Sequence, residues 1–213
     1  MQIETFVLGH FESNCYLIRS DNNEQAWLLD PGGDPQSVIN RLQSLELAPA
    51  AVLLTHGHLD HILGVNALKE VWPEMKVLFP EEDLPIYRNL THQAELFGIV
   101  TSDPPVPDQL LRGVEEIAAS PLKIRSLPTP GHSPGSTVFC MAEGMETEVA
   151  FTGDTLFRES IGRTDLWGGD TGQLEISIRQ SLYQLPAATR VLPGHGPETT
   201  IGWERAHNQF FRV

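Results

Sequence analysis

The chain has 213 residues, of which 40% are hydrophobic, so it can bury a core of one large domain and is not wholly disordered. Its 28 acidic and 14 basic side chains give a formal net charge of −14, which disfavours nucleic acid and anionic membranes as partners. No apolar run approaches the roughly 20 residues of a membrane helix, and no basic segment indicates a signal peptide. With only two cysteines, Cys15 and Cys140, we expect no disulfide framework and a cytoplasmic location.

The first 80 residues alternate between strand-like and helix-like segments. Apolar runs bounded by turn residues predict strands over residues 2–8, 15–19, 25–29, 51–55 and 76–79. Apolar residues at helical spacing predict helices over residues 38–47 and 63–71. Residues 81–112 are interrupted by prolines, so we interpret them as an insertion with one helix over residues 84–97.

The rest of the chain is richer in strands. We predict strands over residues 115–118, 122–127, 137–141, 148–152 and 190–192, and helices over residues 173–185 and 201–209. No repeat or low-complexity linker divides residues 1–213, which predicts a single domain. Several strands end in turns that carry histidine or aspartate, which is how many active sites are assembled on a rigid sheet.

The densest group of such residues is Thr55-His-Gly-His-Leu-Asp-His61, directly after a predicted strand. His56 and His58 alternate with Gly57, so an extended loop points both imidazoles in one direction. Asp60 and His61 begin the next helix and face a second point nearby. Imidazole with carboxylate suits a divalent transition metal, zinc first, and the lack of nearby cysteine disfavours a structural zinc knuckle. The alternative is a set of surface histidines that cap the loop and the helix.

Three further loops each present a histidine or an aspartate beside glycine. His132 lies in Pro-Gly-His-Ser-Pro-Gly, Asp154 in Thr-Gly-Asp-Thr and His195 in Pro-Gly-His-Gly-Pro. Glycine lets such loops approach a ligand closely. Taken singly, His132 could equally be a loop histidine without a chemical role. The side chain of Asp154 could equally form an Asx turn.

The order and spacing of these motifs resemble the metallo-β-lactamase superfamily over nearly the whole chain. The resemblance implies an α/β (α+β) fold, the four-layer αββα sandwich, with a two-metal site. In that pattern one metal is bound by His56, His58 and His132, the other by Asp60, His61 and His195, and Asp154 bridges the two. True β-lactamases usually carry cysteine at the bridging position and lack His61, so antibiotic hydrolysis is not expected.

Within the superfamily the chain is most similar to glyoxalase II, the hydroxyacylglutathione hydrolases, in Gly153-Asp-Thr-Leu-Phe157 and the following Ile161-Gly-Arg163. The segment Thr200–Phe210 resembles a short single-domain branch of that family, and we expect no C-terminal glutathione-binding lobe. Arg163 matches a basic residue that contacts glutathione, although a structural pairing with Asp165 is the alternative. Asp165 replaces an aromatic residue of the family, and Pro197 replaces a tyrosine.

The resemblance implies a hydrolase that uses two divalent metal ions, zinc first and iron or manganese as the other candidates, to cleave a small-molecule thioester. The expected reaction converts S-lactoylglutathione to lactate and glutathione. Asp60 is the catalytic candidate, because it is a ligand and can also orient the attacking hydroxide. Asp30 resembles the family residue that holds a ligand histidine by a hydrogen bond, with a turn-forming aspartate before Pro31 as the alternative.

Three other functions fit the same motifs. An iron persulfide dioxygenase would hold one iron through His56, His132 and Asp154. A lactonase or phosphodiesterase would use the same scaffold, although the net charge of −14 disfavours a ribonuclease. A metal-binding module without catalysis is the last alternative. Nothing in the sequence indicates the oligomeric state.

Overall fold

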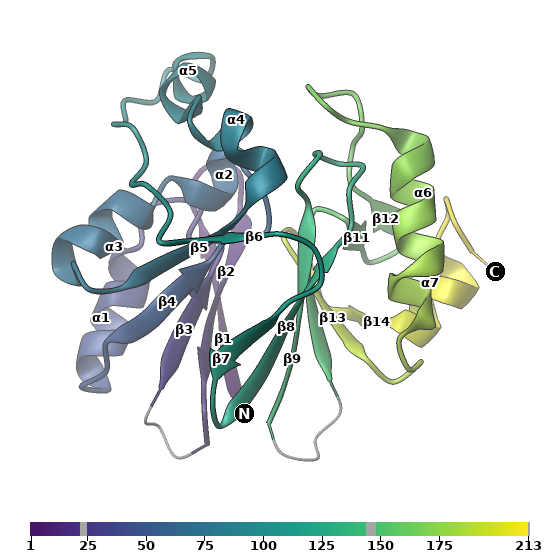
Figure 1. Cartoon of the computed structure of the whole chain (residues 1–213), viewed down its shortest axis with the longest axis horizontal. Helices are drawn as coiled ribbons and strands as arrows, with labels where there is room; N and C mark the ends of the chain where they lie inside the picture. The colour runs from purple at the N-terminus through teal and green to yellow at the C-terminus, as the bar shows by residue number, and fades with distance from the viewer. Residues whose placement is uncertain (22–24, 144–147, 213) are drawn as a thin grey trace. The chain divides into compact units, whose positions relative to one another are not determined.

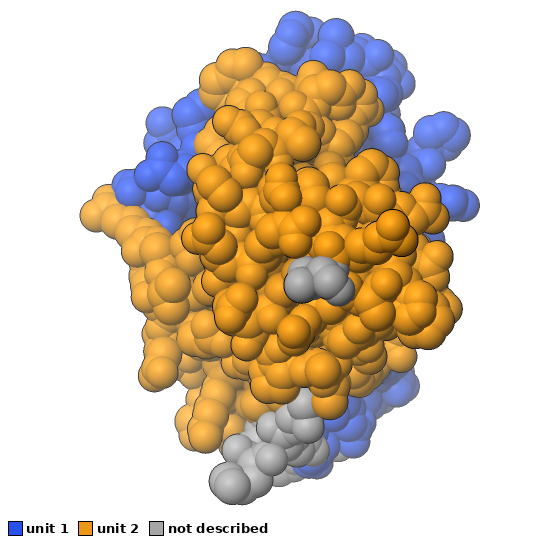
Figure 2. Space-filling view, turned by 90° about the vertical axis from the view of Figure 1, so that its right-hand side faces the viewer, with its two compact units in different colours: residues 1–111 blue, residues 112–213 orange. Residues whose placement is uncertain are grey.

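The computed structural model describes residues 1–21, 25–143 and 148–212. The chain divides into two compact units, residues 1–111 and residues 112–213, which are coloured separately in Figure 2. Each unit is built on one six-stranded sheet. The expectation that residues 1–213 act as a single domain stays a prediction. Within the described residues, no helix has the length and apolar character that crossing a bilayer requires.

The first unit contains strands and helices in alternation (Figure 1). Its strands are β1 (Gln2–Leu8), β2 (Ser13–Arg19), β3 (Ala26–Leu29), β4 (Pro49–Leu53), β5 (Lys76–Pro80) and β6 (Gln109–Leu111). Its helices are α1 (Gln36–Ser44), α2 (Leu59–Ile62), α3 (Val65–Val71), α4 (Leu84–Tyr87) and α5 (Leu90–Glu95). The sheet order follows the chain, with β1 to β3 antiparallel and β3 to β6 parallel.

The core of the first unit lies between its sheet and its helices. Leu17, Leu28 and Val52 are register neighbours on β2, β3 and β4. They belong to one buried cluster with Val38 of α1 and Leu68 of α3, and Figure 1 shows both helices along the same side of the sheet. Because this packing holds β3 and β4 rigidly, the loops that follow these two strands start from fixed points.

The second unit is an analogous layer of sheet and helices. Its strands are β7 (Glu116–Ala119), β8 (Leu122–Pro128), β9 (Thr137–Glu143), β10 (Val149–Gly153), β13 (Arg190–Pro193) and β14 (Thr199–Thr200), in the sheet order β14-β13-β10-β9-β8-β7. A separate hairpin consists of β11 (Leu156–Phe157) and β12 (Ser160–Ile161), and the helices are α6 (Thr171–Gln180) and α7 (Ile201–His207). Cys140, Ala150 and Val191 are neighbours across β9, β10 and β13 and pack with Ile178 and Ile201 of the two helices.

Both cysteines are buried free thiols, which agrees with the expectation that the chain has no disulfide framework. Burial raises the pKa of Cys140 to about 12 and raises the pKa of Cys15 as well. The thiols are therefore protonated at neutral pH in the metal-free chain.

The single helix predicted over residues 84–97 is wrong, because the chain forms α4 and α5 with a break at residues 88 and 89. At the break, the carbonyl of Ile86 accepts hydrogen bonds from the Asn89 amide, at 3.0 Å, and from the Gln93 side chain, at 2.8 Å. These bonds close a turn instead of continuing the helix. The predicted insertion also contributes β6, which extends the first sheet by pairing with β5.

Candidate metal centre

In the first unit, the candidate ligands follow the carboxyl end of β4, and Asp30 follows the carboxyl end of β3, its parallel neighbour in the sheet. The ring of His56 lies 4.8 Å from the ring of His58 and 4.2 Å from the ring of His61, measured between centroids. One ligand nitrogen of His56 lies within 4.8 Å of one nitrogen of each of these two histidines. The Nε2 atom of His61 lies 3.7 Å from Oδ2 of Asp60. The four predicted ligands of this unit therefore gather in one place.

Asp30 lies beneath these ligands and is completely buried. Its carboxylate accepts hydrogen bonds from the Thr55 amide, at 2.8 Å, and from the Thr55 hydroxyl, at 2.6 Å. Its Oδ2 atom lies 3.0 Å from Nδ1 of His61. Since a carboxylate accepts, Nδ1 of His61 carries the proton, and Nε2 is left as the nitrogen with a lone pair for a metal. Asp30 thus contacts His61, a candidate ligand, and its role in holding a ligand histidine stays a prediction.

We expect the substitution Asp30→Asn to weaken metal binding by about 10- to 100-fold, because an amide nitrogen cannot accept the proton of His61. Asparagine also suits the backbone here, since Asp30 has a φ of 49°, a region that asparagine tolerates. Titration of the apoprotein with zinc measures the effect. Unchanged zinc affinity in a folded variant would contradict this role for Asp30.

Residues from the predicted insertion hold the loop that carries the candidate ligands His56 and His58, and sequence reasoning did not find them. The buried carboxylate of Asp83 accepts a hydrogen bond of 2.9 Å from the Gly57 amide. The side chain of Gln93 accepts from the Leu59 amide and donates to the Gly57 carbonyl, each at 3.1 Å. Three hydrogen bonds thus position the backbone on both sides of His58. The insertion therefore supports the candidate ligands of the first unit.

In the second unit, Asp154 lies between two histidines. Its Oδ2 atom is 3.7 Å from Nε2 of His132 and 3.7 Å from Nε2 of His195. Nδ1 of His132 lies 2.8 Å from the carbonyl oxygen of Arg163, which can only accept, so Nδ1 carries the proton and Nε2 has the lone pair. The bulge of β10 at Phe151–Gly153 lies directly before Asp154, and bulges often redirect side chains next to active sites.

The donor atoms fit divalent metal ions in their chemistry and their spacing. A separation of 3.7 Å is too long for a hydrogen bond. It is close to the distance of about 3.4 Å between two donors on a tetrahedral zinc with bonds of about 2.1 Å. All seven candidates supply imidazole nitrogen or carboxylate oxygen, a set that suits zinc, iron or manganese.

Two glycines near the candidate ligands have no room for a side chain. A Cβ atom on Gly32 would lie 1.5 Å from the carbonyl oxygen of Asp60. A Cβ atom on Gly162 would lie 1.8 Å from the carbonyl oxygen of Asp154 and 3.3 Å from Cβ of His132. The glycines of the Asp30-Pro-Gly-Gly33 and Ile161-Gly-Arg163 motifs therefore allow the backbone to pass close to the ligand loops.

The side chain of Arg163 forms two hydrogen bonds with Asp165, of 2.7 and 2.8 Å, and both residues are exposed. The hydrogen bond from Arg163 lowers the pKa of Asp165 to about 2, so the pair is charged at neutral pH. The pairing considered as an alternative from the sequence is therefore present. Binding of substrate by Arg163 stays a prediction.

Comparison with known proteins places these motifs in a family. Residues 8–195 match the family model of the metallo-beta-lactamase superfamily. The probable metallo-hydrolase YqgX of Bacillus subtilis is 35% identical over 99% of this chain and 97% of its own length. The hydroxyacylglutathione hydrolase GloC of Haemophilus influenzae is 38% identical over 99% of this chain and 98% of its own length.

Solved structures are similar over the same extent. The BLEG-1 B3 metallo-beta-lactamase matches with a TM-score of 0.88 and 37% identity, covering 100% of both chains. TTHA1623, solved in a di-iron-bound form, matches with a TM-score of 0.85 and 36% identity, covering 98% of this chain and 100% of its own. ETHE1 from Myxococcus xanthus matches with a TM-score of 0.76 and 28% identity, covering 98% and 84%. These similarities confirm the predicted fold class.

Proposed function

The chain belongs to the metallo-β-lactamase superfamily, and from this premise we propose that it is a dinuclear metal-dependent hydrolase of thioesters. Its proposed reaction converts S-lactoylglutathione to lactate and glutathione. The observation that carries the proposal is the full set of nitrogen and oxygen donors at the ends of strands in both units, with tautomers of His61 and His132 suited to metal binding. The similarity to GloC along the whole chain supports the substrate.

We assign the ligands according to the family resemblance. In that pattern His56, His58 and His132 would hold one ion, Asp60, His61 and His195 would hold the second, and Asp154 would serve both. The solved di-iron form of TTHA1623 supports a site for two ions in a relative of 36% identity. Zinc is the first candidate, and iron and manganese accept the same donors.

When bound, two divalent ions lower the pKa of water and polarise the carbonyl of the substrate. Asp60 would accept a hydrogen bond from the water that attacks the substrate and would orient it toward the carbonyl carbon. Asp30 and the carbonyl of Arg163 hold the rings of His61 and His132, so these ligands do not have to reorganise during the reaction. The leaving thiolate needs no strong general acid.

Metal analysis and a substrate screen test the proposal together. We expect about two metal ions per chain and hydrolysis of S-lactoylglutathione that a chelator abolishes and added zinc restores. The second candidate is a mononuclear iron persulfide dioxygenase, in which His56, His132 and Asp154 would hold the iron. One iron per chain with oxygen consumption on glutathione persulfide, and no thioester cleavage, would establish that candidate instead. Lactones, phosphodiesters and β-lactams complete the screen, because one solved relative is a B3 metallo-beta-lactamase.

We expect a high KM for S-lactoylglutathione, because Asp165 and Pro197 replace an aromatic residue and a tyrosine that contact glutathione in larger members of the family. Such contacts act mainly on substrate binding, so kcat is less affected. The substitution Arg163→Ala raises KM further if Arg163 meets a carboxylate of glutathione. Steady-state kinetics measure both constants.

The matched variant for this prediction is Asp165→Asn. It removes the negative charge of the carboxylate that is paired with Arg163. If Arg163 binds substrate, this variant lowers KM, because the guanidinium is released toward the anionic tripeptide. A KM in the low micromolar range for the unmodified chain, or no change in either variant, would show that other residues bind the substrate.

A further inference from the structure

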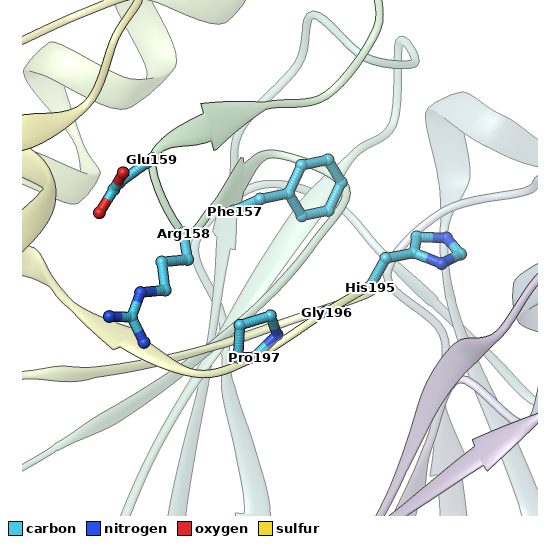
Figure 3. Close-up of a pocket in the computed structure, with 6 residues that line it drawn as sticks. All are labelled: Phe157, Arg158, Glu159, His195, Gly196 and Pro197. Atoms are coloured by element: carbon cyan, nitrogen blue, oxygen red, sulfur yellow. The ribbon is translucent and has the colours of Figure 1, made fainter.

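A cavity of about 320 Å³ opens beside His195 in the second unit, and its size is at the lower end of small-molecule sites. It is lined by Phe157, Arg158, Glu159, His195, Gly196 and Pro197. Figure 3 shows the imidazole of His195 and the guanidinium of Arg158 on opposite sides, with Phe157 and Pro197 between them. The cavity thus has a candidate metal ligand at one side, apolar walls and a cation at the other side.

Hydrogen bonds between the β11–β12 turn and α7 hold the backbone beside Arg158 in place. Arg158 and Glu159 are the two residues that connect β11 to β12, and Glu159 has a φ of 58°. The amide of Glu159 donates a hydrogen bond of 2.8 Å to Glu204, which is completely buried on α7. The indole of Trp203 donates to the carboxylate of Glu159, at 3.1 Å. These bonds fix the tip of the hairpin against α7.

The guanidinium of Arg158 lies over an aromatic ring and has no carboxylate partner among the described residues. Its Cζ atom lies over the Trp203 ring, 5.7 Å from the ring centre, within the range of a cation–π contact. The N–H groups along the edge of a guanidinium are suited to bind a carboxylate in a two-fold contact. Glu159, the acidic residue in the lining, directs its carboxylate away from Arg158 in Figure 3 and bonds Trp203.

The net charge of the chain indicates what Arg158 can bind. The chain has a formal net charge of −14, so an anionic substrate is repelled unless a local cation attracts it. Arg163, by contrast, forms an ion pair with Asp165, at 2.7 Å. Arg158 is therefore the cation that the lining of this cavity offers to an anion.

We propose that this cavity binds the thiol portion of the substrate and that Arg158 pairs with a carboxylate on that portion. Arg158 thereby selects thioesters whose thiol carries a carboxylate over thioesters whose thiol is uncharged. The inference rests on the proposed thioester hydrolysis. With His195 among the proposed ligands, the thioester carbonyl lies at that side of the cavity. The chain of the thiol then passes between Phe157 and Pro197 toward the guanidinium.

Kinetics on two substrates with the same acyl group test the proposal. S-lactoylglutathione carries carboxylates on its thiol portion, whereas S-lactoyl-N-acetylcysteamine carries none. For Arg158→Gln we expect KM for the first substrate to rise about 10-fold, the effect of losing one charge-assisted contact, with kcat nearly unchanged. KM for the neutral substrate stays the same. Arg158→Lys recovers part of the loss because it retains the charge.

The control variant is Arg205→Gln, which removes an exposed arginine of α7 that does not line the cavity and should leave both KM values unchanged. An unchanged KM for S-lactoylglutathione in Arg158→Gln would overturn the inference. An equal rise for both substrates would also overturn it, because the effect would then not depend on a carboxylate. If the unmodified chain cleaves neither substrate, the proposed function itself is wrong, and this inference falls with it.

Discussion

The His58→Ala variant is expected to show no detectable thioester hydrolysis although the chain remains folded. His58 is the residue before α2, and its side chain makes no capping hydrogen bond there. It does not belong to the hydrophobic core of the first unit, so its loss opens no core cavity. It does remove one of the proposed imidazole ligands of one metal ion. Activity, metal content per chain and thermal unfolding of the variant measure these effects.

The control for this variant is His92→Ala. His92 lies on α5, is exposed and approaches Glu95 at 3.6 Å, and we do not predict it to bind metal. Its loss should leave activity and metal content unchanged. Full activity in His58→Ala, with normal metal content, would remove the metal-hydrolase proposal altogether.

The second large effect is expected for Asp154→Asn, which should lower the occupancy of both metal ions. Oδ2 of Asp154 lies at the same distance, 3.7 Å, from Nε2 of His132 and from Nε2 of His195. The family pattern assigns these two histidines to different ions, so the carboxylate is placed to serve both. A neutral amide offers one oxygen and no charge, and it bridges two cations poorly.

Metal analysis of the purified variant decides this prediction, with Asp34→Asn as the control. Asp34 is exposed and accepts a hydrogen bond from the Gln36 amide, which an asparagine oxygen can also accept. The control should retain both ions. Loss of a single ion in Asp154→Asn would show that Asp154 is a terminal ligand of one metal and not a bridge.

Much of the fold and the identity of the candidate ligands could be predicted from local sequence. The strand over residues 2–8 and the turn-bounded strands before Asp30 and His56 appear as β1, β3 and β4. Such segments are marked by short apolar runs and by turn residues, which act over a few neighbours in the chain. The His-Gly-His-Leu-Asp-His pattern is local in the same sense, because one loop and one helical turn contain it.

Short strands and interrupted helices could not be predicted in this way. β6, β11, β12 and β14 have two or three residues each, and each is held by hydrogen bonds to a partner strand. At the break between α4 and α5, the side chain of Gln93 donates to the Ile86 carbonyl, and it also donates to Gly57 in the loop of the candidate ligands. No local pattern distinguishes such a glutamine from an exposed one.

The sequence by itself determined which side chains are available as metal donors and at which strand ends they lie. Only the tertiary structure decided how these donors are held. Nδ1 of His61 meets Asp30, and Nδ1 of His132 meets the carbonyl of Arg163, each across 31 residues of chain. The amide of Gly57 meets Asp83 across 26 residues. The physical reason is that a hydrogen bond needs its two atoms within about 3 Å, and groups so distant in the chain reach that separation only when the sheet and its helices have packed.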